Sequence, residues 1–259
     1  MRRLNSKILI ELRRQILKAS SHSKEGHVPS AFSILEILYV IYVVIPSKHN
    51  LVMEKDYDFI LSKGHGSLAL YAVLNAAGTI NDDWVIEFCK ENSKYGGHPD
   101  KQKIPGVVAS TGSLGHGLPI AVGRVLANRN KSRRQRSYCL VGDGELNEGS
   151  NWESLLLVEN FNLFELCLII DQNNSTTRAV RVTALQNKLE SFGFRVVVVN
   201  GHDIEALEKV LMEPLGIDPI AIIAETTKGK GLELMENTFE WHHRSPSELE
   251  LADFLEELK

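Results

Sequence analysis

Histidines that directly follow a glycine are unusually frequent in this sequence. The 259 residues contain nineteen glycines and nine histidines, so random pairing would give fewer than one Gly-His dipeptide, yet five occur. Their histidines are His27, His65, His98, His116 and His202. A glycine lets the backbone turn sharply, and the imidazole that follows can exchange protons near neutral pH. Gathered in one pocket, such histidines would suit proton transfer and the stabilisation of oxyanions on a polyhydroxylated substrate.

Two other interpretations of these histidines are open. A loop histidine often does no more than hydrogen-bond the backbone, and this applies to each Gly-His pair taken alone. The second alternative is a zinc site. Zinc is not favoured, because no two of these histidines lie three to five residues apart and no cysteine accompanies them.

A second group of polar residues contains Asp143, Gly144 and Asn173. The segment GDGELNEG (142–149) follows an apolar run and precedes a helical pattern, and Asn173 follows the next apolar run. A strand–helix–strand crossover would bring Asn173 beside Asp143, since neighbouring parallel strands lie about 4.8 Å apart. A carboxylate, an amide oxygen and a loop carbonyl suit Mg²⁺ that also binds phosphate oxygens. The alternative is a tight turn followed by a capped helix.

The same segment does not match the common nucleotide-binding loops. GDGELNEG lacks the G-x-G-x-x-G spacing of dinucleotide-binding proteins. The P-loop pattern G-x-x-x-x-G-K-[ST] occurs nowhere in the chain. A diphosphate bound here would therefore need another kind of loop.

Short apolar runs alternate with helical patterns along the chain and indicate the fold. The runs lie at 59–62, 138–141, 166–171, 195–199 and 220–225. Helical periodicity occurs at 4–19, 32–45, 67–77, 116–130, 149–160, 203–212 and 247–258. This alternation predicts an α/β fold, one domain over residues 1–259, with a mostly parallel sheet and helices on both faces. Polar segments follow each run, so we expect them at the carboxyl edge of the sheet, where such folds bind ligands.

Composition and charge exclude several classes of protein. Hydrophobic residues make up 43% and charged residues 24%, as in a globular protein, and the net charge of −4 predicts binding to neither nucleic acid nor an anionic membrane. The longest apolar run, Ile37–Ile45, is about half of the roughly 20 residues that span a bilayer. The N-terminal segment is typical of an amphipathic helix, not a signal peptide. Three cysteines without a CxxC pair favour a reducing compartment, so we predict a cytoplasmic protein.

Several segments together resemble one known family. The GDG motif, with Asn173 after twenty-eight intervening residues, is similar to the diphosphate–metal motif of thiamine-diphosphate enzymes. Six segments resemble the transketolase family, in family order: GHVPSAFSILEIL, FILSKGHGSLALYAVL, YGGHPDKQKIPGVVASTGSLGHGL, GDGELNEGSNWE, VVNGHDIEAL and TTKGKG…ENTFEWHHRSP. The resemblance covers the chain from about residue 10 to residue 250. It implies a thiamine-diphosphate-binding fold. More narrowly, it implies the N-terminal, diphosphate-binding subunit of a split transketolase, whose pyrimidine-binding and C-terminal domains form a separate chain.

The resemblance also implies roles for individual residues. The Mg²⁺ ligands would be Asp143, Asn173 and the backbone carbonyl of Ser175. The cofactor-binding residues would be His65, Gly112, Ser113, Leu114, Gly144, Glu148 and Asn173, with Glu148 at the interchain contact beside the cofactor. The histidines around the thiazolium and the donor ketose would be His27, His65, His98 and His242, with His243 as the alternative to His242.

Two departures from the family pattern leave specialisation open. His116 stands where the family usually has a glutamine, and residues 175–190 are more polar and several residues shorter than the family's loop. Other activities on the same scaffold are therefore alternatives. These are another thiamine-diphosphate-dependent ketol or acyl transfer, a deoxyxylulose-phosphate-synthase-like condensation, and a non-catalytic cofactor-binding subunit.

The activity that the resemblance implies is transfer of a two-carbon ketol unit from a ketose or its phosphate to an aldose or its phosphate. In the family, the glutamate that acts on the pyrimidine ring belongs to the pyrimidine-binding domain, for which this chain is too short. We therefore expect a partner subunit that supplies this domain, in an α₂β₂ heterotetramer, with thiamine diphosphate and Mg²⁺ as cofactors.

Overall fold

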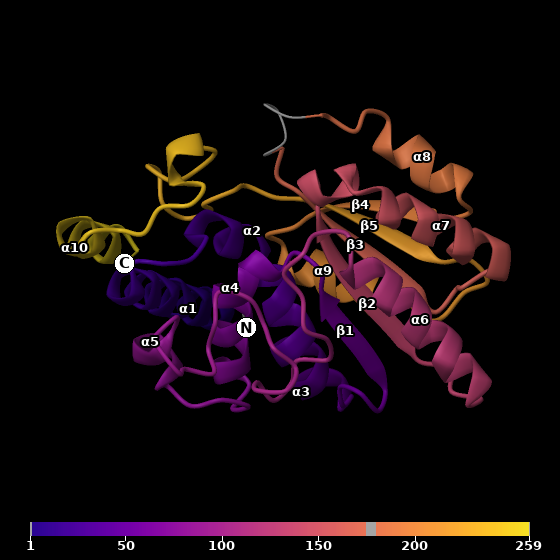
Figure 1. Ribbon diagram of the computed structural model, residues 1–259, viewed down its shortest axis with the longest axis horizontal. Helices are drawn as coiled ribbons and strands as arrows, with labels where there is room; N and C mark the ends of the chain where they lie inside the picture. Colours follow the sequence, from indigo (N-terminus) through magenta and orange to yellow (C-terminus); the bar gives the residue numbers. More distant parts are fainter. Residues whose placement is uncertain (1, 175–179, 259) are drawn as a thin grey trace.

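The five apolar runs of the sequence form the five strands of one parallel sheet. The computed structural model describes residues 2–174 and 180–258 (Figure 1). The strands are β1 (Tyr57–Leu61), β2 (Arg136–Gly142), β3 (Leu166–Gln172), β4 (Arg195–Asn200) and β5 (Ile220–Glu225). Their order across the sheet is β1-β2-β3-β5-β4, and every neighbouring pair is parallel. The predicted parallel sheet is confirmed.

Helices occur at all the positions where the periodicity predicts them. The longer helices are α1 (Arg2–Ser23), α2 (Val28–Tyr39), α4 (Ser67–Ala76), α6 (Gly117–Asn130), α7 (Gly149–Phe161), α9 (Ile204–Leu211) and α10 (Glu248–Glu257). The shorter ones are the π-helix Val40–Val44, α3 (Ile45–His49), α5 (Trp84–Glu87) and α8 (Leu185–Ser191). The polar sequence of residues 175–190 predicts a loop, whereas α8 begins within this segment. This helix has a single fully buried side chain, Leu189, so its apolar face is too narrow to give a clear helical period.

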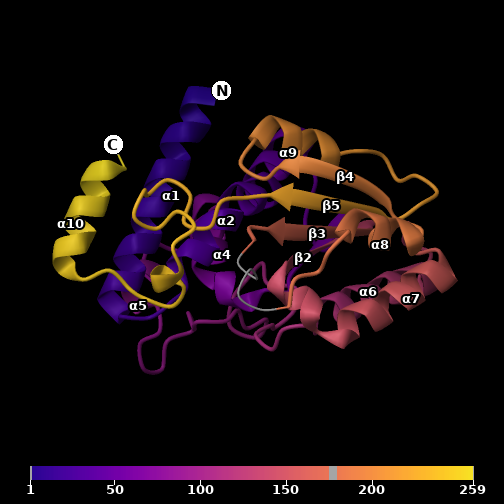
Figure 2. The ribbon, with the colours of Figure 1, turned by 90° about the horizontal axis from the view of Figure 1, so that it is seen from above.

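Helices cover both faces of the sheet, which confirms the predicted fold class (Figure 2). Successive strand residues point to opposite faces. Phe59 and Ile169 belong to a large apolar core that also contains side chains of α1, α2, α4 and α9. Ile60 and Ile170 belong to a smaller core on the other face, with side chains of α6, α7 and α8. Both faces of β1, β2, β3 and β5 are buried, which explains their continuous apolar runs without polar alternation. The edge strand β4 is only partly buried, although its run of valines is equally apolar.

The helical stretch Val28–His49 lies at the centre of the larger core. By length and composition it could cross a membrane, with a mean hydropathy of 2.1 over its most apolar window. However, 94% of that window is buried inside the protein, and every residue of α2 is buried. The stretch is therefore a core helix of the protein.

Candidate active site

A cavity of about 330 Å³ lies at the carboxyl edge of the sheet, where the segments that follow the strands meet. Nine of the predicted site residues line this one cavity: His27, His65, His98, Gly112, Leu114, Asp143, Gly144, Asn173 and His242. They come from distant parts of the sequence, and parallel strands bring them together because their carboxyl ends share one edge.

The other predicted residues do not line this cavity. The side chains of Ser113 and Glu148 are exposed. Ser175 lies outside the described residues. His116 is exposed as well, with its Nδ1 atom 3.1 Å from the carbonyl oxygen of Leu114. The Gly-His pattern thus marks three cavity histidines and also two histidines, His116 and His202, that face elsewhere.

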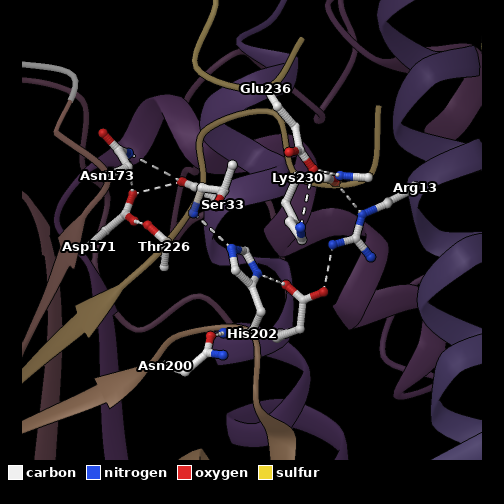
Figure 3. Close-up of polar contacts among 12 residues, drawn as sticks. Arg13, Ser33, Asp171, Asn173, Asn200, His202, Thr226, Lys230 and Glu236 are labelled. Carbon is white, nitrogen blue, oxygen red and sulfur yellow. Dashed lines mark hydrogen bonds and ion pairs between the residues drawn. The ribbon is translucent and has the colours of Figure 1, made fainter. Parts of the chain in front are cut away.

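The predicted metal ligands Asp143 and Asn173 follow adjacent strands. Asp143 follows β2, and its side chain accepts a hydrogen bond from the Gly144 backbone N–H at 2.8 Å. The side-chain amide of Asn173 donates to the Asp171 carboxylate at 2.9 Å. Figure 3 shows the amide oxygen of Asn173 on the side away from Asp171. One carboxylate and one amide oxygen are thus presented at neighbouring strand ends.

Asp171, at the end of β3, is the centre of a buried polar cluster that the sequence analysis missed. Its side chain is fully buried. It accepts hydrogen bonds from Ser33 at 2.7 Å and Asn173 at 2.9 Å, and a further one from the Thr226 hydroxyl (Figure 3). The Nζ atom of Lys63 donates to the same carboxylate at 2.5 Å. We call these five residues the Asp171 cluster. It joins helix α2 to the carboxyl ends of β1, β3 and β5.

Two buried lysines, Lys63 and Lys228, also line the cavity. They are 2% and 6% exposed. Lys63 forms an ion pair with Asp171, whereas the Nζ atom of Lys228 lies 2.6 Å from the Nδ1 atom of His242. Burial, together with the charge of Lys63, lowers the pKa of Lys228 to about 8. Buried cations require compensation, so this wall of the cavity is suited to an anionic ligand.

Four histidine rings gather beside these lysines, and those of His27, His65 and His242 line the cavity. The ring centroid of His27 lies 5.1 Å from that of His65, 5.7 Å from His242 and 4.5 Å from His243. We call these four residues the histidine cluster. Burial lowers the pKa of His27 to about 4, and burial with the nearby charge of Lys63 lowers the pKa of His65 to about 2. Both imidazoles are therefore neutral at pH 7, and a neutral imidazole can both donate and accept a hydrogen bond.

The two adjacent histidines His242 and His243 have different surroundings. His242 lines the cavity, and its carbonyl oxygen lies 3.0 Å from the Nδ1 atom of His27. His243 does not line this cavity, and its Nε2 atom lies 4.0 Å from the carboxylate of Glu25. The structure thus places His242, rather than His243, at the cavity.

Glycine at position 112 leaves room for the ring of His98. A Cβ atom added to Gly112 would lie 3.2 Å from Cγ of His98, closer than most Cβ contacts. A larger residue at position 112 would therefore displace the imidazole. This is a physical reason for a glycine in the loop beside the cavity.

Glu145 holds the end of the loop that contains Gly112, and this residue was not predicted from the sequence. Its buried carboxylate accepts hydrogen bonds from the backbone N–H of Gly115 at 2.9 Å and of Gly142 at 3.2 Å, and from the hydroxyl of Ser62. Burial raises the pKa of Glu145 despite these donors. A glutamate in a glycine-rich turn has no sequence signature of burial, because most of its partners come from other segments.

The oxygen donors at this edge fit a hard divalent cation. Among residues 2–174 and 180–258, no three His, Cys, Asp or Glu side chains form a group that could hold a metal. Asp143 and Asn173 would therefore hold Mg²⁺ only together with further oxygen atoms, such as those of a diphosphate. A carboxylate and an amide oxygen suit Mg²⁺ better than softer metals.

Comparison with known proteins identifies the class to which this fold and cavity belong. Residues 5–257 match the family described as "Transketolase, thiamine diphosphate binding domain". The chain therefore belongs to the transketolase family, and the resemblance of its motifs is confirmed. It is a transferase chain of the transketolase type.

Relatives of similar length define the chain more narrowly. It is 40% identical to a protein of Actinobacillus succinogenes named as one of the subunits of apulose-4-phosphate transketolase, over 96% of this chain and 93% of the relative. It is 31% identical to the protein of the same name from Phocaeicola vulgatus, over 91% of this chain and 86% of the relative. The chain thus corresponds to the N-terminal, diphosphate-binding subunit of a split transketolase.

Solved transketolases share the fold but are much longer. The structure superposes on transketolase from Campylobacter jejuni with a TM-score of 0.86 at 27% identity, covering 97% of this chain and 43% of that one. For transketolase from Leishmania mexicana the TM-score is 0.85 at 28% identity, covering 98% and 41%. This chain therefore spans less than half the length of those transketolases.

Proposed function

We propose that this chain binds thiamine diphosphate and Mg²⁺ in the cavity at the sheet edge and, with a partner subunit, transfers a two-carbon ketol unit between sugar phosphates. One observation carries the proposal: a single cavity joins two buried lysines and the pair Asp143–Asn173 to four histidines. When bound, the cofactor supplies the reactive carbon that makes and breaks the carbon–carbon bond.

The charged and polar residues of this cavity, apart from the histidines, would hold the diphosphate and the metal. Asp143, Asn173 and the carbonyl of Ser175 would coordinate Mg²⁺. Lys63 and Lys228 would neutralise the remaining charge of the diphosphate. Gly144, the residue after Asp143, has no side chain, so its backbone can approach a phosphate group. The loop residues Gly112, Ser113 and Leu114 would lie over the cofactor.

The histidines would orient the sugar and move its protons. His27 and His65 have lowered pKa values, so at pH 7 each offers one N–H donor and one nitrogen acceptor to a hydroxyl group. Such a group can take a proton from a hydroxyl and return it in a later step. His98 and His242 line the same cavity and would contact the donor's oxygen atoms.

We propose that the partner supplies the pyrimidine-binding domain in an α₂β₂ heterotetramer. The exposed apolar side chains of two helices support an interface. Ile120 of α6 is 38% exposed, and Leu156 and Leu157 of α7 are 56% and 45% exposed. These apolar groups are available for burial against a partner chain. Glu148, just before α7, would lie at the same contact.

We propose apulose-4-phosphate as the first sugar to test and the cytoplasm as the location. The sugar is chosen because two relatives that this chain matches over most of their length are named for it. The location rests on three cysteines that are all free thiols in the structure.

Reconstitution with the partner chain tests this function. We expect ketol transfer from apulose-4-phosphate or another ketose phosphate, dependent on both thiamine diphosphate and Mg²⁺. Pyruvate serves as the comparison donor, because turnover of pyruvate would support the condensation alternative. Ordinary activity of this chain without a partner would contradict the split-transketolase proposal.

A single substitution tests the metal site. Asp143→Ala should weaken Mg²⁺-dependent binding of thiamine diphosphate by at least about 100-fold, because a ligand of the metal is removed. The control is Asp218→Ala, since Asp218 is exposed and away from the cavity. Calorimetric titration with and without Mg²⁺ measures the effect. Equal binding by the Asp143 variant and the control would refute the metal assignment.

A further inference from the structure

The backbone on both sides of Lys228 is held by side chains that do not line the cavity. The N–H of Thr227 donates to the Nε2 atom of His202 at 2.8 Å (Figure 3). The carbonyl of Lys230 accepts from the Nε atom of Arg13 at 2.9 Å. Lys228 lies between these two anchored residues, and its own side chain lines the cavity. Neither His202 nor Arg13 lines it.

Glu36 connects the two anchoring side chains. Its Oε1 atom lies 2.5 Å from the guanidinium of Arg13, and its Oε2 atom lies 2.9 Å from Nδ1 of His202. Since Nε2 of His202 accepts from Thr227, the ring proton must be on Nδ1, which donates to Glu36. The side chains of Arg13, Glu36 and His202 are 7%, 5% and 13% exposed, so water does not compete strongly for these contacts.

The charge of Glu36 is maintained in this buried position. Burial opposes ionisation of the carboxyl, but the Arg13 guanidinium and the hydrogen bond from His202 outweigh it and lower the pKa of Glu36. A buried charge pair with all its hydrogen bonds formed fixes its partners in one geometry. Glu36 therefore holds Arg13 and His202 in the orientations that reach the two backbone groups.

The neighbouring backbone is adapted to this arrangement. Gly231 has a φ of +103°, and a Cβ atom there would lie 3.1 Å from Nε of Arg13. The N–H groups of Thr226 and Gly229 donate to backbone carbonyls, of Gln172 at 3.2 Å and Pro29 at 3.0 Å. Thr227 differs from these two residues, because its N–H donates to a side chain. A substitution can therefore remove this one anchor without changing the others.

We propose that Arg13, Glu36 and His202 form a clamp that positions Lys228 in the cofactor cavity. His202 belongs to the last Gly-His pair of the sequence, and its role here is positioning, with no direct contact to a ligand. The effect on the cofactor rests on the proposed function, because the ligand that Lys228 would bind is the diphosphate. The geometric part of the proposal, the restraint of Thr227, stands on this chain alone.

Two substitutions of His202 separate the two ring nitrogens. Asparagine can place an amide N–H near the position of Nδ1 and keep the bond to Glu36, but it has no acceptor near the position of Nε2. Glutamine can place an amide oxygen near Nε2 and keep the bond from Thr227. His202→Asn should therefore release Thr227, and His202→Gln should restore it. Each variant thus keeps one of the two ring contacts, asparagine the bond to Glu36 and glutamine the bond from Thr227, at nearly constant polarity.

Amide hydrogen exchange of Thr227 in the full chain, without cofactor, measures the clamp directly. We expect His202→Asn to speed exchange of this amide by about tenfold or more, since a buried N–H loses its acceptor. His202→Gln should stay within about threefold of the unchanged chain. Melting temperatures monitor the fold. Equal exchange in both variants and the unchanged chain, or equal acceleration in both variants, would overturn the clamp.

Binding of thiamine diphosphate with Mg²⁺, to the chain with its partner, measures the consequence. His202→Asn should raise Kd about tenfold, and His202→Gln should raise it much less. In a Lys228→Met background the same His202→Asn change should have little further effect on Kd, because both changes act on one contact. An undiminished effect there would show that His202 acts by another route. Failure of the unchanged protein to bind the cofactor would refute the proposed function, and the exchange result would still decide the clamp.

Discussion

The Asp171 cluster and the histidine cluster both contribute residues to one cavity, and they are built differently. In the Asp171 cluster, a buried carboxylate accepts hydrogen bonds from four other residues, and the charge of Lys63 is paired at 2.5 Å. In the histidine cluster the contacts are mainly between rings, and burial keeps His27 and His65 neutral. The Asp171 cluster is built around compensated charge, and the histidine cluster is built around uncharged imidazoles.

The difference shows how one small cavity can serve two chemical tasks. A fixed anion next to two lysines keeps cationic groups ordered for a charged ligand. Neutral imidazoles remain able to accept protons, because they are not already charged. Lys228 links the two clusters, since it contacts His242 and lies near the charges of Asp171 and Asp143.

The largest effect is expected from removing the central charge of the Asp171 cluster. Asp171→Asn removes the partner of a lysine that is 2% exposed and leaves its charge buried and uncompensated. We expect the free energy of unfolding to fall by about 3 to 5 kcal/mol. Urea unfolding of the variant measures this loss. The control is Asp218→Asn at an exposed position, which should change stability by less than about 0.5 kcal/mol. A loss of similar size in both variants would contradict the role given to the cluster.

A smaller, pH-dependent effect is expected at the histidine cluster. His27 has a pKa of about 4 in the folded protein and 6.5 as its ordinary value, so below pH 6.5 the unfolded chain takes up a proton that the folded chain does not. Its contribution to stability is therefore complete above pH 6.5 and is lost as the pH falls toward 4. His27→Asn should make the decrease in unfolding free energy between pH 7 and pH 5 smaller.

Asparagine at position 27 can still donate to the carbonyl of His242, so this variant isolates the titration. His22→Asn is the control, because His22 is exposed at the end of α1. It should leave the pH dependence of the urea midpoint unchanged. An equal pH dependence in the unchanged protein and the His27 variant would show that the histidine cluster does not resist protonation.

The smallest effect is expected where Lys228 contacts His242 of the histidine cluster. Burial lowers the pKa of His242, and the charge of Lys228 lowers it further. Lys228→Met removes only the second cause, so the pKa of His242 should rise part of the way toward its ordinary value. NMR titration of the imidazole signals measures this rise. Lys209→Met, on α9, should leave the His242 signal unchanged, and the absence of a difference between the two variants would place Lys228 away from the histidine cluster.

The sequence predicted the sheet and much of the cavity for one physical reason. Strands buried on both faces are continuous apolar runs, and parallel strands end at the same edge, so the residues after each run must meet. Asp143, Asn173 and His65 could be placed at one site on that basis together with the family resemblance. The order of β4 and β5 could not be predicted, because both crossovers connect similar apolar runs.

The residues that fix the site were harder to predict than those that line it. Lys63, Glu145 and Lys228 are charged residues that an isolated sequence places at the surface, since such side chains are rarely buried without partners. Their partners can lie far away along the chain, as Lys63 and Asp171 illustrate, separated by 108 positions. The Gly-His count was also an incomplete guide, because His202 turns away from the cavity to hold Thr227.

The position of β5 has a consequence for how the chain is made. β5 is synthesised last of the five strands but lies inside the sheet, between β3 and β4. During synthesis, β4 emerges before the strand with which it pairs, and it must wait unpaired until β5 inserts. Lys228 and His242 follow β5 in the chain. The last lining residues of the cavity are therefore added only after the strand that completes the sheet. A ribosome-bound intermediate ending before β5 would lack a finished sheet and a finished cavity at the same time.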